Sequence, residues 1–237
     1  MDLSPGLLGT FRAEASALLA AVRAVDQGAP VPACPGLTVN DIVRHVGGIY
    51  RLVSVWIVQG CRPETMPDAP EDPFDWAAEG ADRLHRQLAG LDPAAPCATW
   101  FAADRTVGFW IRRMAHETAV HRVDVMQAAG TAWGIDHEVA ADGLDEAVQL
   151  WLGTQLGADV NGSGRVVRIG NRWSVRLLTG LVDYPLPSVA ADAVVTGDPA
   201  SLWAWAWGRT DSAHPVVITG SDGAAAEVRA ALARAQQ

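Results

Sequence analysis

The stretch from Met114 to Val125 reads MAHETAVHRVDV and lies inside a predicted helix of residues 104–129, which Gly130 closes. Apolar side chains recur along this helix every three or four residues, at Val107, Trp110, Ile111, Met114 and Val125. Such spacing is typical of the inward face of a helix in a bundle. Glu117 and His121 share that face, although a buried carboxylate is costly unless another group compensates its charge. The stretch therefore predicts a helical bundle with a polar site in its interior.

Three kinds of partner could compensate Glu117. The first is His121, one turn along the same helix, in an i, i+4 pair. The second is Arg112 or Arg113, folding back from positions that lie off the apolar face. The third is a divalent metal ion, because a carboxylate and an imidazole one turn apart project toward a common point. The E-x-x-x-H pattern alone leaves these three open.

His45 offers a third ligand on another helix. A capping-box pattern at Thr38 and Asp41 predicts a helix from there to Gln59, and His45 lies at the edge of its apolar stripe. A lone histidine in such a position is more often a packing residue than a ligand. Together with Glu117 and His121 on a facing helix it completes a His–Glu–His set, and three N/O ligands with an open position are typical of catalytic zinc sites. His116, about 100° around its helix from Glu117, is expected to face a neighbouring helix or solvent.

The remaining pattern predicts an α+β protein with two domains. Helices are expected over residues 5–26, 39–59, 74–90, 104–129 and 137–157, separated by segments rich in proline and glycine. Four short strands are expected within 165–170, 173–178, 191–197 and 214–220, with helices from 198 and 221. Asp198 is the expected N-cap of the first of these, with Pro199 behind it. We therefore predict an up-and-down four-helix bundle over residues 1–157 and a small α+β domain over 158–237.

Composition and charge argue against several classes of partner. The net charge is −9, from 18 basic and 27 acidic residues, and no run of Lys or Arg occurs. A nucleic-acid partner and an anionic membrane partner are therefore not expected. The first residues resemble an amphipathic helix rather than a signal peptide, and no apolar run could cross a bilayer, so a cytoplasmic protein is expected. Cys34, Cys61 and Cys97 form no C-x-x-C pair and are expected to be packing residues.

Four segments together carry a family resemblance. They read VPACPGLTVNDIVRHVGGIYR at 31–51, FWIRRMAHETAVHRVDV at 109–125, AADGLDEAV at 140–148 and GDPASLWAWAWGR at 197–209. They resemble the mycothiol-dependent maleylpyruvate isomerase family. The resemblance implies a DinB-like bundle followed by a small sterol-carrier-like α/β domain. It also implies that His45, Glu117 and His121 bind a divalent metal, most often zinc, and that mycothiol is a thiol cosubstrate.

The resemblance implies a metal-dependent and mycothiol-dependent enzyme. A thiol coordinated to a metal is deprotonated. Its sulfur would attack a small electrophile, and the outcome is either S-transfer or cis–trans isomerisation. A second hypothesis keeps the metal but uses bound water for hydrolysis, and a third is a non-catalytic binding module. The intact His45, Glu117 and His121 argue against the third. The oligomeric state stays open, and a homo-oligomer is among the options.

Further site residues are predicted outside the His–Glu–His set. Arg209 is a candidate catalytic cation, since the family places an important arginine in its C-terminal domain, but it is equally a helix C-terminal charge. Asp142 and Glu146 are either acceptors for mycothiol hydroxyls or solvated acids. Two further expectations are that Arg122 and Asp124 support the metal ligands, and that Trp203, Trp205 and Trp207, spread around one helix, do not all face one core.

Overall fold

The computed structural model describes residues 4–156 and 161–236. The chain forms two compact units, Met1–Gly134 and Ile135–Gln237, each with its own core. The first is helical and the second contains a sheet, so the predicted α+β class is confirmed. No helix within the described residues is both long enough and apolar enough to span a lipid bilayer.

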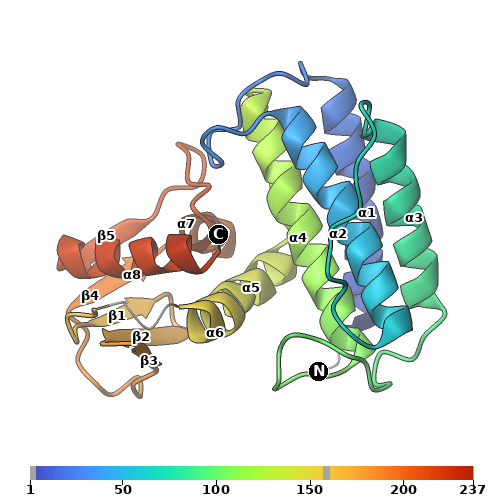
Figure 1. Cartoon of the computed structure of the whole chain (residues 1–237). Coiled ribbons are helices and arrows are strands. Elements are labelled where there is room, and N and C mark those ends of the chain that lie inside the picture. The colour runs from blue at the N-terminus through green and yellow to red at the C-terminus, as the bar shows by residue number, and fades with distance from the viewer. Residues whose placement is uncertain (1–3, 157–160, 237) are drawn as a thin grey trace. The chain divides into compact units, whose positions relative to one another are not determined.

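The first unit is built from four long helices (Figure 1). These are α1 (Ser4–Arg23), α2 (Val39–Gln59), α3 (Phe74–Ala89) and α4 (Val107–Ala128). The capping box predicted for α2 is present: the Thr38 Oγ1 accepts from the Asp41 N–H, and the Asp41 carboxylate accepts from the Thr38 N–H. Gly60, with φ of 70°, ends the same helix in the left-handed conformation. All four helices lie within a few residues of their predicted bounds.

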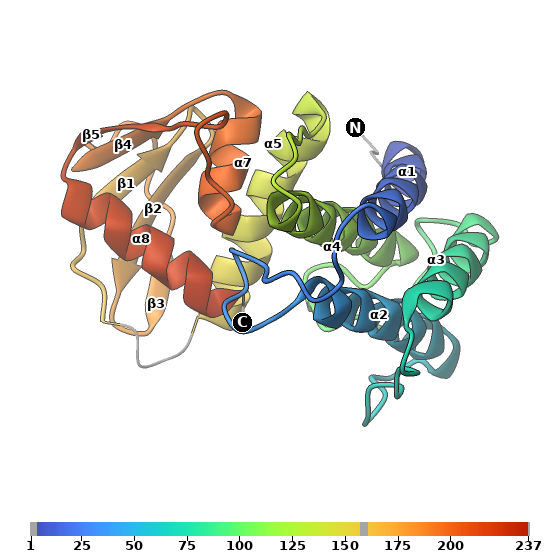
Figure 2. The ribbon, with the colours of Figure 1, turned by 90° about the horizontal axis from the view of Figure 1, so that it is seen from above.

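The directions of the helices differ in part from the predicted up-and-down order. α1 packs against α4 and α3, while α2 packs against α3 and α4 (Figure 2). Arg51 donates to the Trp76 carbonyl and Ser54, further along α2, to Gln87, so α2 and α3 run in the same direction. The chain makes this possible because residues 60–73 return along the bundle, where Arg44 near the start of α2 donates to the Ala69 carbonyl.

α4 is buried on nearly all sides. The predicted inward residues are buried, and the helix also buries a set of polar side chains, namely Arg113, His116, Glu117, Thr118, Arg122 and Asp124. The buried surface of α4 is therefore wider than the single apolar face expected from the sequence, because α4 packs against both α1 and α2. Polar groups buried in this way need partners within the bundle. α4 is thus the element that brings charged groups into the interior of the first unit.

The second unit begins with a segment that was predicted as one long helix of the bundle. It consists of α5 (His137–Asp145), the π-helical η1 (Glu146–Leu152) and the short α6 (Gly153–Gln155). Its contacts are with the sheet-containing unit: α5 packs against α7 (Pro199–Trp207), and the Trp207 Nε1 donates to the Gly143 carbonyl at 3.1 Å. The boundary between the two units of the structure lies between residues 134 and 135, whereas the boundary predicted from the sequence lies after residue 157.

A five-stranded sheet forms the rest of the second unit, in the order β3-β2-β1-β4-β5. Its strands are β1 (Val166–Ile169), β2 (Trp173–Leu178), β3 (Leu181–Asp183), β4 (Ala193–Thr196) and β5 (Val217–Gly220). β1 and β4 are parallel, and the other pairs are antiparallel. β3 was not predicted, because it has only three residues and none of them is buried. The buried face of β1 and β4 packs against α8 (Asp222–Ala235).

α7 is buried more completely than its sequence suggests. As predicted, Asp198 is the N-cap, with its Oδ1 2.7 Å from the Ser201 N–H, and Pro199 follows it. Trp203, Trp205 and Trp207 spread around the helix, yet all three are buried. Their burial on different sides of the helix is compatible with the expectation that they do not all face one core, because α7 is buried around most of its circumference.

Candidate metal centre

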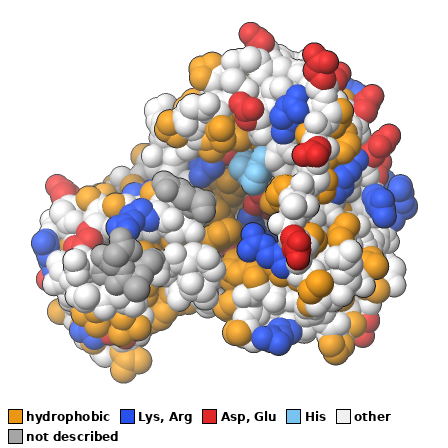
Figure 3. All heavy atoms as spheres, in the orientation of Figure 1, with side chains coloured by type: hydrophobic (Ala, Val, Ile, Leu, Met, Phe, Trp, Pro, Cys, Tyr) orange, Lys and Arg blue, Asp and Glu red, His pale blue; other side chains and the backbone are white. Residues whose placement is uncertain are grey.

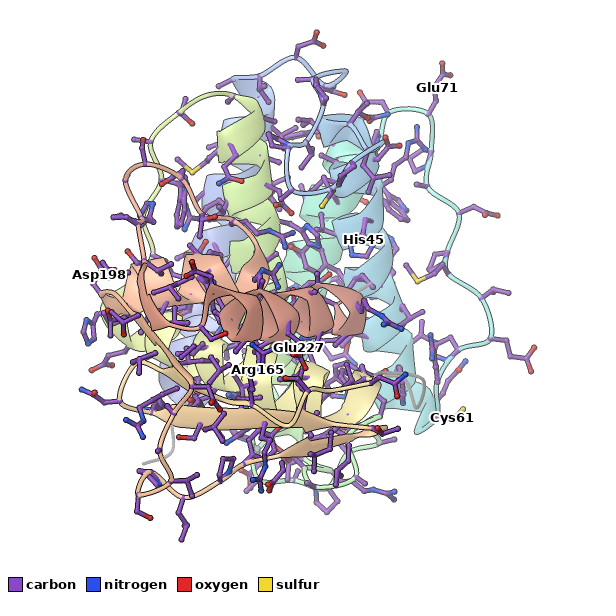
Figure 4. All side chains as sticks on the ribbon, turned by 90° about the vertical axis from the view of Figure 1, so that its left-hand side faces the viewer. His45, Cys61, Glu71, Arg165, Asp198 and Glu227 are labelled. Atoms are coloured by element: carbon purple, nitrogen blue, oxygen red, sulfur yellow. The ribbon has the colours of Figure 1, made fainter. Side chains whose placement is uncertain are left out.

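Three predicted ligands converge inside the first unit. His45 lies on α2 (Figure 4), and α2 packs against α4. Glu117 and His121 lie one turn apart on α4. The Glu117 Oε1 is 2.9 Å from the His45 Nε2 and 3.3 Å from the His121 Nε2. One ligand atom from each residue lies within 4.8 Å of the other two. A zinc ion bound at about 2.0–2.1 Å to each atom would hold them at comparable separations. The residues therefore fit a divalent metal.

The two oxygens of Glu117 have different partners. The Oε1 lies between the two histidines, while the Oε2 forms an ion pair with the buried Arg113, one turn back on α4. Two of the compensating partners left open by the sequence, a histidine and an arginine, are therefore present together. Arg113 also fixes the carboxylate so that one oxygen is directed at the histidines. The sequence leaves the pairing of Glu117 with Arg112 or Arg113 open as one of three alternatives, and the structure contains the pair with Arg113.

His121 has a second carboxylate on its other ring nitrogen. Its Nδ1 lies 2.9 Å from the Oδ2 of Asp124, a residue on α4 with 0% exposure. The same Oδ2 lies 3.8 Å from the Sγ of Cys34, in the segment before α2. The i, i+3 spacing of His121 and Asp124 is visible in the sequence, and this contact agrees with the supporting role expected for Asp124. The contact with Cys34 joins residues far apart in the chain and was not predicted.

For both Glu117 and His121, burial and the neighbouring polar groups shift the pKa in opposite directions. Burial acts to raise the pKa of Glu117, but the charge of Arg113 and the hydrogen bonds from His121 and His45 hold that pKa well below its usual range. Burial acts to lower the pKa of His121, but the hydrogen bonds to Asp124 and Glu117 raise it to about 9. Without a metal, His121 is therefore protonated at neutral pH, and its positive charge compensates the carboxylates of Glu117 and Asp124.

The three candidate ligands differ in their exposure to solvent. The side chains of Glu117 and His121 are 11% and 12% exposed, whereas that of His45 is 44% exposed. On the face that Figure 3 shows, a histidine side chain reaches the surface with hydrophobic, basic and acidic side chains around it. His45 is therefore the most accessible of the three candidate ligands, and catalytic metal sites keep one position accessible to an exogenous molecule.

The other predicted site residues lie in the second unit. Arg209 follows Gly208, which ends α7, and its guanidinium donates to the Trp207 carbonyl. Asp142 lies on α5 and is partly exposed, while Glu146, at the start of η1, is only 1% exposed. The description of Glu146 as a solvated acid is therefore wrong. The residues predicted to bind mycothiol are thus not equivalent in their access to solvent.

Other polar residues of the two units are buried or have structural partners instead. Arg122, which was expected to support the metal ligands, pairs with Glu14 of α1 and donates to the Gly134 carbonyl. His116 is completely buried, so of the two alternatives expected for it, a neighbouring helix or solvent, solvent is excluded. His214 is buried with its Nδ1 2.9 Å from Asp211. Arg122 and His214 therefore have polar partners other than Glu117.

Comparison with known proteins supports this assignment of the fold. The chain is 27% identical over 150 residues to uncharacterised proteins from two strains of Mycobacterium tuberculosis, covering 63% of this chain and 78% of theirs. The crystal structure of the mycothiol-dependent maleylpyruvate isomerase superposes with a TM-score of 0.55 at 19% identity, and that of a mutant of it with 0.56 at 17%. Each of these two structural superpositions covers 91% of this chain and 92% of the other chain.

Family models match both units of the chain. Residues 8–126 match the Mycothiol maleylpyruvate isomerase N-terminal domain, and residues 138–227 match the MDMPI C-terminal domain. The first match contains His45, Glu117 and His121, and the second contains Arg209, Asp142 and Glu146. Because the two matches together span most of the chain, this protein belongs to the mycothiol maleylpyruvate isomerase family.

Proposed function

We propose that this protein is a metal-dependent enzyme that uses mycothiol to convert a small electrophilic substrate, as an isomerase or an S-transferase. The observation that carries the proposal is the convergence of two imidazole nitrogens and one carboxylate oxygen in an otherwise buried interior. Membership of the family and the fold shared with the mycothiol-dependent maleylpyruvate isomerase support the thiol and the reaction class.

In this proposal each residue of the centre has a distinct task. His45 and His121 bind the metal through Nε2 and Glu117 through Oε1, while Arg113 holds the other oxygen of Glu117. A divalent cation, most simply zinc, supplies the positive charge that keeps a thiol deprotonated at neutral pH. The partial exposure of His45 leaves the side of the centre from which a thiol would enter.

The thiolate sulfur adds to an electron-poor carbon of the substrate and forms a carbon–sulfur bond. In a cis–trans isomerase the added thiol converts the double bond to a single bond, which rotates before the carbon–sulfur bond breaks and releases the thiol. In an S-transferase a leaving group departs instead and the sulfur stays on the product. No cysteine of the protein is needed as a nucleophile in either case.

The second unit is proposed to contribute binding groups. Arg209 would stabilise negative charge on an anionic substrate, and Asp142 and Glu146 would accept hydrogen bonds from mycothiol hydroxyls. Asp142 is the better candidate of the two acids, because Glu146 is almost completely buried. Replacing Arg209 by Met is expected to lower kcat/KM by about 10²-fold without loss of metal. Arg165→Met, at an exposed arginine of the same unit, is the matched control.

Metal analysis of purified protein tests the centre directly. We expect about one divalent metal ion per chain, lost in Glu117→Ala and in His121→Ala. His137→Ala, which removes an exposed histidine outside the centre, should retain the metal. Stoichiometric metal in both ligand variants would refute the assignment of the ligands.

Turnover assays then test the thiol. Maleylpyruvate and model electrophiles should be converted only when mycothiol is present. Thiol-independent turnover that still needs the metal would favour hydrolysis by bound water and refute the proposed mechanism. A protein that binds metal but converts none of these compounds would favour a binding module.

A further inference from the structure

Asp124 is a buried carboxylate that touches one predicted metal ligand on the side away from the metal site. Its side chain has 0% exposure, and its Oδ2 lies 2.9 Å from the Nδ1 of His121. The opposite ring nitrogen of His121, Nε2, is directed toward Glu117 Oε1. Of the two ring nitrogens of His121, Asp124 therefore contacts the one that would not bind the metal.

This geometry selects one tautomer of His121. A neutral imidazole has a proton on either Nδ1 or Nε2, and a carboxylate accepts a hydrogen bond only from the protonated nitrogen. With Asp124 beside Nδ1, the proton lies on Nδ1 and the lone pair of Nε2 is available to a metal. The contact also fixes the ring plane, because His121 and Asp124 lie on adjacent turns of α4.

We infer that Asp124 is the positioning residue of the metal centre: it orients His121 with Nδ1 as donor and Nε2 as ligand. This inference rests on the metal site of the proposed function. Carboxylates in this position raise the basicity of the ligating histidine, and their loss weakens metal binding about 10–100-fold. Asp124 acts through His121 and touches neither the metal nor the substrate.

The contact with Cys34 shows how Asp124 itself is placed. The Cys34 Sγ lies 3.8 Å from the same Oδ2, and it comes from a turn in which the Cys34 N–H donates to the Val31 carbonyl. A thiol is a weak donor, so the imidazole N–H is the stronger partner of the carboxylate. The segment before α2 thus packs against the carboxylate that supports a ligand on α4.

Zinc affinity of the full-length protein, measured by competition with a chromophoric chelator, tests the inference. Asp124→Ala is expected to weaken zinc binding about 10–100-fold. Asp124→Asn keeps an oxygen that accepts from Nδ1 but loses the charge, so its affinity should lie between those of wild type and Asp124→Ala. Glu14→Gln is the control. It breaks the ion pair between Glu14 of α1 and Arg122, which lies on α4 like Asp124 but does not contact the predicted ligands in that pair. It should lower thermal stability but leave zinc affinity unchanged.

Long-range 1H–15N spectra of histidine in the zinc-loaded protein give a readout that a merely structural role would not change. In wild type, the His121 Nδ1 should carry a proton protected from exchange with solvent, and in Asp124→Ala that protection should be lost. Zinc affinity within threefold of wild type, together with a protected proton in Asp124→Ala, would overturn the inference and leave the metal site intact. A wild-type protein that binds no zinc would overturn the metal site, and the inference with it.

Discussion

Glu117 divides its two oxygens between an arginine and a pair of histidines, and the site depends on that division. Arg113 neutralises the carboxylate in the metal-free protein, so the buried charge is tolerated before any metal binds. A metal would add positive charge on the opposite oxygen. The stability of the bundle and the affinity for metal are therefore coupled through one side chain.

Removing Arg113 should expose this coupling. Arg113→Met removes the guanidinium that pairs with Glu117 and leaves the two histidines as its partners, so it is expected to destabilise the metal-free protein by about 3–5 kcal/mol. The loss should be smaller in the zinc-loaded protein, because the metal compensates the carboxylate. Urea unfolding with and without zinc measures both values, and Arg105→Met, at an exposed arginine before α4, is the control. Equal losses with and without zinc would contradict the coupling.

The stability of the metal-free protein should also depend on pH through His121. Its pKa in the folded protein is raised to about 9, above the value of about 6.5 expected in the unfolded chain. The stabilisation is therefore complete below about pH 6.5 and is lost as the pH rises through 9. The free energy of unfolding of wild type should fall over this range, relative to His121→Gln. Parallel pH profiles of the two proteins would rule this out.

At the scale of elements, the site depends on the close packing of α2 against its neighbours. α2 carries His45, and two turns from its start it meets α3 at Gly47. A Cβ added at Gly47 would lie 2.6 Å from the Trp76 ring and 3.1 Å from the backbone of Ala77. The absence of a side chain therefore allows the two helices to approach. The position of His45 depends on that spacing.

Gly47→Ala should consequently destabilise the bundle, although alanine favours helices. Overpacking against Trp76 and the α3 backbone is expected to cost about 1–3 kcal/mol. Gly9→Ala is the matched control in α1, because a Cβ there meets no atom within 4 Å. That substitution should stabilise the protein by about 0.5–1 kcal/mol. Thermal or urea unfolding of the two variants compares them, and a stabilising Gly47→Ala would disprove the role of close packing.

At the scale of the whole molecule, the chain separates metal ligands from the remaining predicted binding groups. His45, Glu117, His121 and the residues that contact them belong to Met1–Gly134, while Arg209, Asp142 and Glu146 belong to Ile135–Gln237. The matches to two distinct family models follow the same division. Metal binding and turnover should therefore be separable experimentally.

A fragment of residues 1–134 tests this separation. It contains all four helices of the bundle and their core, so we expect it to fold and to bind zinc. It should not catalyse turnover, because it lacks Arg209. Circular dichroism and metal analysis report folding and binding, with the Glu117→Ala fragment as the control. A folded fragment that binds no zinc would show that the second unit is required for the site.

Local sequence patterns predicted most of the elements. The capping box at Thr38 and the N-cap Asp198 followed by Pro199 marked helix starts that the structure contains. The prediction failed where tertiary contacts decide. The three-residue β3 exists only because β2 offers it a neighbour, and η1 departs from the α-helix that its sequence suggested. The direction of α3 depends on the path of residues 60–73, which carries no periodic signal.

By itself, the sequence determined the α+β class, the helix containing Glu117 and His121, and the three candidate ligands. These follow from spacing within single segments, where helical geometry relates neighbouring residues directly. Only the tertiary structure decided that His45 meets Glu117 and that Cys34 reaches the carboxylate of Asp124. Those contacts depend on how separate helices pack and where buried charges find partners, and no local pattern contains that information.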